Sequence, residues 1–222
     1  MFAKAPIGRQ QHAARQRLDR HCHDDAFATV VLRGSYLEAG DEGRRTIEAG
    51  EVLIHHAYES HLDCFSARGA EVLILPIATA AALPLHGQVA DPDELVRIAK
   101  DSPIDAWHRL TETLRPCDRQ HLDWPDQLAE QLRDQPALPL RQWAEAMGLR
   151  AETVSRGFKL AYGSSPKAFR ASARARAAFG RIRNSRQSLA DIAAALGFAD
   201  QAHMSRAIRT LTGRPPQAWR VA

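Results

Sequence analysis

The hydrophobic positions of the chain change their spacing along its length. In residues 21–77, short β-branched and apolar runs stand between glycine-containing turns, as at Phe27–Leu32, Val52–Ile54 and Val72–Leu75. Such runs predict buried strands, and many of them in succession predict a small sandwich or barrel. We therefore expect a small N-terminal β-sandwich or barrel within residues 1–90.

Beyond this region, apolar residues recur at helical spacing. Leu95 and Ile98 lie on one such face, and Trp107 and Leu110 lie on another. A period of three to four residues predicts amphipathic helices. We expect a helical connector over residues 91–135, which prolines close to its end separate from the rest of the chain.

The remaining residues contain an internal repeat. Residues 140–149 match residues 189–198 in their apolar positions, and both segments end in an apolar–Gly–apolar sequence. After one extra residue in the second copy the match resumes, with the pairs Ser155 and Ser205, Arg156 and Arg206, Gly163 and Gly213, and Pro166 and Pro216. Each copy predicts a helix, a tight glycine turn and a second helix. We expect an all-α domain over 136–222 with helix-turn-helix units at 140–163 and 189–213.

The charge distribution suggests what this domain binds. Residues 136–222 carry 15 Lys and Arg against 4 Asp and Glu, a net +11, whereas residues 1–135 carry 15 against 22, a net −7. A basic helical domain predicts a polyanionic partner, either nucleic acid or a membrane surface. The chain has no apolar run long enough to span a bilayer, no secretory signal and only three cysteines, so we expect a cytoplasmic, nucleoid-associated protein without a membrane partner.

The second copy reads Gly197-Phe-Ala-Asp-Gln-Ala-His-Met-Ser-Arg-Ala-Ile-Arg-Thr-Leu-Thr-Gly-Arg-Pro-Pro-Gln-Ala-Trp-Arg220. This sequence resembles the C-terminal signature of the AraC/XylS family of bacterial transcription regulators, with Met204, Ile208 and Trp219 as departures. The resemblance extends from about residue 140 to residue 220. It implies an activator or repressor that binds double-stranded operator DNA, and it allows RNA polymerase and a second copy of the chain as further partners.

The resemblance also implies which residues meet DNA, because the second helix of each unit would enter a major groove. The implied contact residues are Glu152, Ser155, Arg156 and Lys159 in the first unit, and Gln201, Ala202, Ser205, Arg206 and Arg209 in the second. Arg can bind guanine and Gln can bind adenine bidentately, whereas Lys159 and Arg209 are expected on phosphates. A linker helix over Lys167–Arg183, about 25 Å long, would hold the units toward adjacent groove segments, and most of its arginines are expected only to keep it soluble.

The first helix-turn-helix unit departs from the family pattern at two residues. Arg150 stands where a serine cap is usual, and Gly157 interrupts the second helix. A mid-helix glycine costs about 1 kcal/mol relative to alanine. We therefore expect the first helix-turn-helix unit to be the less stable of the two, or the one that discriminates less between DNA sequences.

The N-terminal region resembles the two sequence blocks of the cupin barrel, through His21-Cys-His23, Gly34, Ala49–Ile54 and His61. This resemblance implies a divalent metal such as Zn²⁺ on His21, His23 and His61, although Phe27 and Ala28 occupy the slots of the usual glutamate ligand. Strand geometry places His21 and His23 on one face. The alternatives are polar residues at a barrel mouth and a barrel that binds a small-molecule effector.

Three functions follow from these observations. The first is a sequence-specific transcription regulator controlled by a small effector in the barrel. The second is a cupin metalloenzyme with a basic helical DNA-binding appendage, and the third is a nonspecific architectural DNA-binding protein. The missing glutamate ligand and the duplicated unit favour the first, so we predict a multidomain α+β protein that is not an enzyme.

Overall fold

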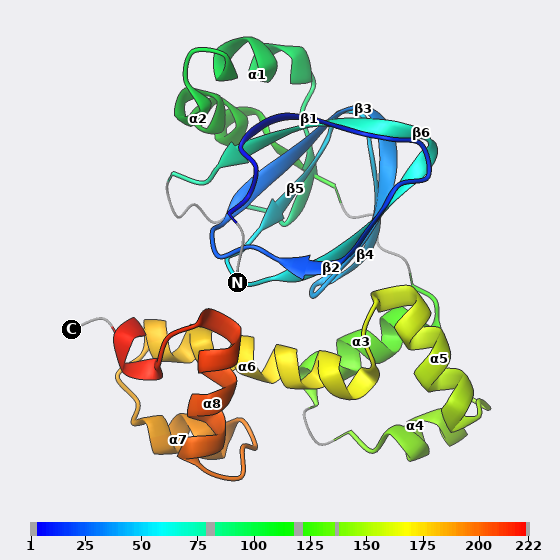
Figure 1. Cartoon of the computed structure of the whole chain (residues 1–222), viewed down its shortest axis with the longest axis vertical. Helices are drawn as coiled ribbons and strands as arrows, with labels where there is room; N and C mark the ends of the chain where they lie inside the picture. Colours follow the sequence, from blue (N-terminus) through cyan, green and yellow to red (C-terminus); the bar gives the residue numbers. More distant parts are fainter. Residues whose placement is uncertain (1–3, 79–82, 118–121, 136–137, 221–222) are drawn as a thin grey trace. The chain divides into compact units, whose positions relative to one another are not determined.

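The computed structural model describes residues 4–78, 83–117, 122–135 and 138–220. The chain forms two compact units, residues 1–121 and 122–222. In the described residues, the first unit contains an eight-stranded antiparallel sheet and two helices, whereas the second is helical (Figure 1). The predicted α+β class is confirmed.

The sheet of the first unit is built around two long strands. Its strands are β1 (Gly8–His12), β2 (Arg17–Cys22), β3 (Phe27–Gly40), β4 (Gly43–Glu48), β5 (Glu51–His55), β6 (Ser60–Pro76), β7 (His86–Gln88) and β8 (Arg115–Pro116). Their order is β1-β6-β3-β5-β7-β8, while β2 pairs with β6 and β4 pairs with β3. Because β3 and β6 each carry two shorter partners along their length, the sheet curls on itself (Figure 1).

The two long strands approach each other closely where their register shifts. Gly34 of β3 has a φ of 74°, and a Cβ there would lie 2.1 Å from the carbonyl oxygen of Gly69. Only glycine tolerates both the left-handed backbone and this approach. The pairing register shifts on both sides of Gly34, which is where bulges bend a strand.

Apolar residues cover both faces of the sheet at the centre of the first unit. Val52 and Leu73 pack with α1 (Pro92–Ala99) and α2 (Pro103–Thr113), whereas Leu53 belongs to the core of the opposite face. Alternate residues of a strand point to opposite faces, so a strand buried on both faces is apolar throughout. This explains why the sequence shows continuous apolar runs here.

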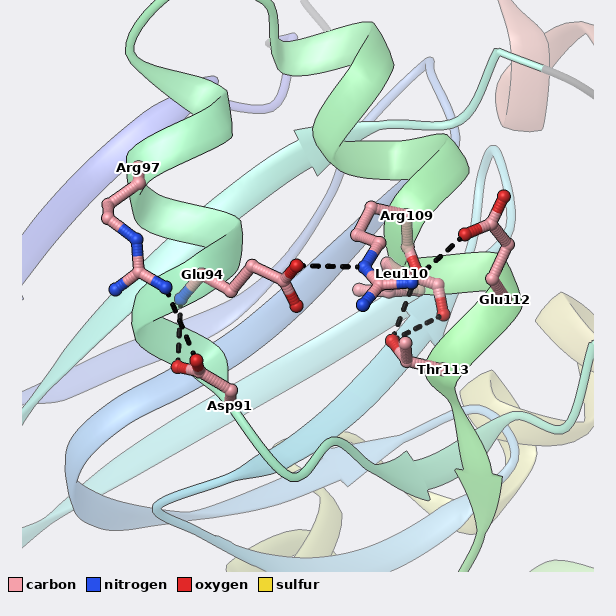
Figure 2. Close-up of polar contacts among 7 residues, drawn as sticks. All are labelled: Asp91, Glu94, Arg97, Arg109, Leu110, Glu112 and Thr113. Carbon is pink, nitrogen blue, oxygen red and sulfur yellow. Dashed lines mark hydrogen bonds and ion pairs between the residues drawn. The ribbon is translucent and has the colours of Figure 1, made fainter.

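An ion pair joins helices α1 and α2. Arg109 of α2 donates from Nε to Glu94 Oε1 of α1 at 3.0 Å, and Asp91 caps α1 by accepting the Glu94 N–H at 2.9 Å (Figure 2). Exposed ion pairs of this kind stabilise by less than about 1 kcal/mol. Burial of Leu95 and Trp107 against the sheet therefore does most to hold the helices in place.

The second unit is organised around one long helix. Its helices are α3 (Trp124–Asp134), α4 (Leu140–Ala146), α5 (Ala151–Tyr162), α6 (Pro166–Asn184), α7 (Leu189–Ala195), α8 (Gln201–Thr212) and a short 3-10 helix, Pro216–Trp219. Helix α6 contacts α3, α5, α7 and α8, so both helix pairs are attached to it (Figure 1). No helix in the described ranges is both long and apolar enough to cross a membrane.

The residues expected to form a separate connector, 91–135, are divided between the two units. Helices α1 and α2 pack on the sheet, whereas α3 packs on α5 and α6. The apolar face of each helix is covered by its own unit, with Trp107 buried in the first and Leu128 buried in the second. Periodicity showed that these helices were amphipathic, but it carries no information about which surface covers them.

Candidate nucleic-acid interface and histidine cluster

The second unit contains two helix pairs of the same local design. Helices α4 and α5 form the first pair, and α7 and α8 form the second. Both second helices end at a glycine in the left-handed region, Gly163 with a φ of 67° and Gly213 with a φ of 73°. The glycine N–H donates to the carbonyl of Lys159 in one pair and of Arg209 in the other, so the two ends are equivalent.

The second helix of each pair turns one apolar face into the unit. Val154 and Phe158 of α5 are buried, as are Met204 and Ile208 of α8. These residues are three or four positions apart, which aligns them on one side of a helix. The opposite side of each helix is consequently left at the surface.

The nine residues expected at DNA all lie on α5 and α8 and face away from the core. Ser205 is half-buried and the other eight are exposed, namely Glu152, Ser155, Arg156, Lys159, Gln201, Ala202, Arg206 and Arg209. At about 100° per residue, the four on α5 fall within a stripe roughly 100° wide. The arrangement presents a cationic stripe on each second helix, with Arg156 and Arg206 at equivalent positions.

The N-terminal ends of the two second helices differ. Asp200 precedes α8, and its side chain accepts the His203 N–H at 2.6 Å. Arg150 precedes α5, and its side chain makes no such capping bond. The departure seen in the sequence therefore leaves the first turn of α5 without the cap that α8 has.

Gly157 has a packing role that the sequence did not show. A Cβ at Gly157 would lie 2.5 Å from Cζ2 of Trp124 in α3, so the glycine lets α3 approach the middle of α5. A second contact between these helices is the hydrogen bond from the Tyr162 hydroxyl to Asp126 Oδ1, at 2.7 Å. The loss of helix propensity at Gly157 is thus accompanied by a buried contact.

Two arginines of α6 tie this helix to the two pairs. Arg170 donates from Nη2 to the carbonyl of Leu138, just before α4, at 2.6 Å. Arg174 donates from Nη1 to the carbonyl of Gly197 at 3.0 Å, and its guanidinium lies 5.5 Å from the Phe198 ring centre. These two side chains fix the orientation of the pairs on α6, which is more than the solubilising role expected of them.

In the first unit, the three histidines proposed as metal ligands lie together. His21 and His61 are opposite each other on β2 and β6. Ring centres are 4.3 Å apart for His21 and His61, 5.1 Å for His21 and His23, and 5.7 Å for His23 and His61. One ligand nitrogen of each lies within 4.8 Å of the others, a spacing that a single metal ion can bridge.

The structure adds ionisable residues that the sequence interpretation missed. His55 of β5 and Glu38 of β3 form a second group with His61, again with ligand atoms within 4.8 Å of one another. Asp63 lies beside them, with Oδ2 3.9 Å from His61 Nε2. His55 could have been predicted from the sequence, because it lies two residues after Leu53 and so on the same face of β5. Glu38 could not, because no sequence pattern near it indicates its contact with His55 and His61.

Burial favours the uncharged forms of these side chains. Desolvation lowers the pKa of His55 to about 3 and also lowers the pKa of His61 well below its usual range. The same effect raises the pKa of Asp63 to about 7 and raises the pKa of Glu38. The 3.6 Å contact between His55 and Glu38 is therefore not an ion pair, and the neutral imidazoles can offer a lone pair to a ligand.

These histidines line a cavity of about 220 Å³. The lining also includes apolar residues, among them Leu18, Phe65, Val72 and Ile74. A single water needs only about 10–15 Å³ by a comparable measure, so the cavity can hold a small organic molecule. A mixed lining of this kind suits a ligand that has both polar and apolar groups.

Comparison with known proteins finds a family match in the second unit. Residues 143–222 match a family model described as a helix-turn-helix domain. The chain is similar to the C-terminal domain of AraT, a response regulator from Geobacillus stearothermophilus, with 20% identity over 43% of this chain and 82% of that one, and a TM-score of 0.40. It is also similar to ToxT from Vibrio cholerae with unsaturated fatty acid bound, with 12% identity over 99% and 96% of the two chains and a TM-score of 0.44.

A third similar structure is the DNA-binding domain of AdpA in complex with target DNA, with 21% identity over 44% of this chain and 90% of that one, and a TM-score of 0.40. All three TM-scores lie below 0.5. The assignment of the second unit as a helix-turn-helix domain therefore rests on the sequence match over residues 143–222. Among curated proteins, none matches this chain.

Proposed function

We propose that this chain, whose second unit matches a helix-turn-helix domain, is a sequence-specific DNA-binding transcription regulator of the AraC type that reads two adjacent major-groove segments. The observation that carries the proposal is the duplication itself: α5 and α8 are equivalent helices on one α6, and each exposes a cationic stripe. Helix-turn-helix domains place such a second helix in the major groove. A net charge of +11 over residues 136–222 favours a phosphate backbone as the partner.

The spacing of the two readers supports a single chain spanning two half-sites. Helix α6 has 19 residues and is therefore about 28 Å long. Adjacent major-groove segments on one face of B-DNA are roughly 34 Å apart. Because both helix pairs contact α6, we propose that α5 and α8 enter neighbouring segments.

The proposed base contacts and phosphate contacts lie on different parts of each second helix. We propose that Glu152, Ser155 and Arg156 of α5, and Gln201, Ala202, Ser205 and Arg206 of α8, face base edges. Lys159 and Arg209 lie nearer the C-terminal ends, where we place them on phosphates. Arg156 and Arg206 can each bind guanine O6 and N7, which makes them the main determinants of sequence.

Selection of bound sequences from a random duplex pool tests this proposal. We expect a recovered site with two informative blocks about one helical turn apart, and an affinity that falls steeply with salt because phosphate contacts release counterions. Unrelated DNA should compete poorly. Equal competition by unrelated DNA would instead support a nonspecific architectural protein, and an affinity that is insensitive to salt would contradict phosphate binding.

For the first unit, we propose a cupin-like barrel that binds a small effector in its cavity. Two features support this role: the curled sheet, and the 220 Å³ cavity, whose lining contains histidines as well as apolar residues. We favour this role over a cupin metalloenzyme, because the second unit matches a helix-turn-helix domain and contains two equivalent helix pairs. Ligand binding is tested by a small-molecule screen for stabilisation of the full chain, in which a hit should lose its effect in Phe65→Ala.

A divalent metal such as Zn²⁺ is a second candidate for this cavity. His21, His23 and His61 fit it because their nitrogens lie within 4.8 Å of one another and burial keeps at least His61 neutral. The bound ion would supply a fixed positive charge in the cavity. Elemental analysis of the purified chain should then find metal whose content falls by about one equivalent in His23→Ala, and an unchanged metal content in this variant would count against this candidate.

A further inference from the structure

A third group of metal-ligand side chains lies in the first unit, away from the cavity histidines. It consists of Glu51 at the start of β5, His86 at the start of β7 and Cys117 directly after β8. One ligand atom of each residue lies within 4.8 Å of the other two. Glu51 and His86 are buried, and Cys117, which forms no disulfide, is half-buried.

The pairing of three adjacent strands explains why these residues meet. Leu53 of β5 is opposite His86 of β7, and Glu51 lies two residues from Leu53 on the same face. Gly87 of β7 is opposite Pro116 of β8, and the Cys117 N–H donates to the His86 carbonyl at 3.0 Å, so Cys117 continues this register opposite His86. All three side chains therefore lie on one face of the β5–β7–β8 edge.

The Glu51 carboxylate lies close to both other side chains, with one oxygen toward each. His86 Nε2 lies 3.5 Å from Glu51 Oε2, and Cys117 Sγ lies 3.6 Å from Glu51 Oε1. Metal–ligand distances of about 2.0–2.3 Å place neighbouring ligands of a tetrahedral Zn²⁺ ion roughly 3.3–3.7 Å apart. The Glu48 N–H also donates to Glu51 Oε2 at 2.8 Å and so orients the carboxylate, as outer hydrogen bonds do at metal sites.

We propose that Glu51, His86 and Cys117 bind a divalent ion of the Zn²⁺ class. A thiolate, an imidazole and a carboxylate together select a borderline ion such as Zn²⁺ or Co²⁺ over Mg²⁺ or Ca²⁺. Binding transfers the thiol proton of Cys117 to solvent and leaves a thiolate–metal bond. The three protein ligands leave a fourth position for water.

The ion would connect the last strand of the first unit to the centre of its sheet. Cys117 lies five residues before Leu122, where the described part of the second unit begins. The site is also separate from the cavity cluster, since His55 lies four residues, or about 13 Å of strand, from Glu51. The two sites can therefore be removed independently, and neither depends on DNA binding.

Co²⁺ titration of the chelator-treated full chain tests the proposal, with His23→Ala as the background that disables the cavity cluster. We expect a thiolate-to-Co²⁺ charge-transfer band in this background, which disappears in Cys117→Ser and persists in Cys64→Ser as the matched control. As a second measurement, Zn²⁺ should slow the alkylation of Cys117, followed by mass spectrometry, and leave the rate at Cys64 unchanged.

Two results would overturn the proposal. The first is the absence of the charge-transfer band together with no protection of Cys117 by Zn²⁺, which would make the three residues a hydrogen-bonded group only. The second is a band that survives Cys117→Ser, which would place the ion on another thiol. Because serine differs from cysteine by one atom, Cys117→Ser tests the ligand without removing a large side chain, and its circular dichroism spectrum shows whether it is folded.

Discussion

At the scale of single residues, the same type of side chain has different roles in the second unit. Arg174 on α6 donates to the Gly197 carbonyl and holds a helix pair in place, whereas Arg206 and Arg209 on α8 are exposed. Charge alone could not separate these roles, because the sequence shows only that the region is basic. The two roles are distinguished by how far each arginine side chain is buried, which follows from helix packing.

Arg206 and Arg209 should differ in what they contribute to DNA binding. We predict that Arg206→Ala weakens binding to the preferred site by about 1–3 kcal/mol and relaxes preference at one base pair. Arg209→Ala should weaken all sequences about equally and lower the salt slope by about one. Affinities for a panel of single-base variants check this, and the reverse assignment of the two effects would mean that α8 is rotated differently in the groove.

Gly157 should tolerate no side chain despite its position inside a helix. We predict that Gly157→Ala lowers the free energy of unfolding by about 1 kcal/mol, because the clash with Trp124 outweighs the gain in helix propensity. Denaturant unfolding of the second unit measures the change. In a Trp124→Ala background the same substitution should be neutral or stabilising, and destabilisation there as well would show that Trp124 is not the cause.

The sequence could not predict this contact for a physical reason. Gly157 lies 33 positions after Trp124, and neither residue shows a local pattern that indicates the other. The sequence showed the intrinsic helix-propensity cost of glycine, but not the tertiary contact that accompanies it. The same limit applies to Glu38 and His55, which the curl of the sheet brings to His61.

At the scale of elements, periodicity and end signals predicted most helices well. The segments 140–163 and 189–213 contain α4 with α5 and α7 with α8, because apolar spacing and terminal glycines are local properties. The strands were predicted less completely, since β3 and β6 continue far beyond the apolar runs Phe27–Leu32 and Val72–Leu75. Their remaining parts include polar residues, which pairing with β4 and β2 keeps in the sheet.

The unequal caps of α5 and α8 should be visible in stability. We predict that Arg150→Ser stabilises the second unit by about 1 kcal/mol, because a serine hydroxyl can accept an N–H from the first turn of α5. Asp200→Ala should destabilise it by a similar amount, since it removes an existing cap. Thermal unfolding of both variants checks this. If Arg150→Ser has no effect while Asp200→Ala does, another contact already fixes the start of α5.

At the scale of the whole molecule, the boundary between the units lies earlier than the proline-rich segment suggested. Helix α3 buries Leu128 and Leu132 in the second unit, and its Asp126 accepts the Tyr162 hydroxyl. Prolines end a helix, but they mark a domain boundary only if few contacts cross them. Contacts from α3 to α5 and α6 cross this segment, so the linker read from sequence lies inside a unit.

This boundary determines which fragment should work alone. We predict that a fragment of residues 122–222 folds and binds DNA, whereas one of residues 138–222 is less stable by several kcal/mol, since burying one leucine contributes about 1.5–3 kcal/mol. Chemical denaturation and DNA titration of both fragments measure the difference. Equal stability would show that α3 is not part of the second unit, and a folded 122–222 fragment without DNA binding would place an essential contact in the first unit.

The central claim is that one chain reads two DNA segments with α5 and α8. The most direct test is to measure Arg156→Ala and Arg206→Ala against every single-base variant of the selected site. We predict that each substitution abolishes preference at one position and that the two positions lie roughly one helical turn, about 10 base pairs, apart. Loss of preference at the same position in both variants, or a uniform loss at all positions, would contradict the claim.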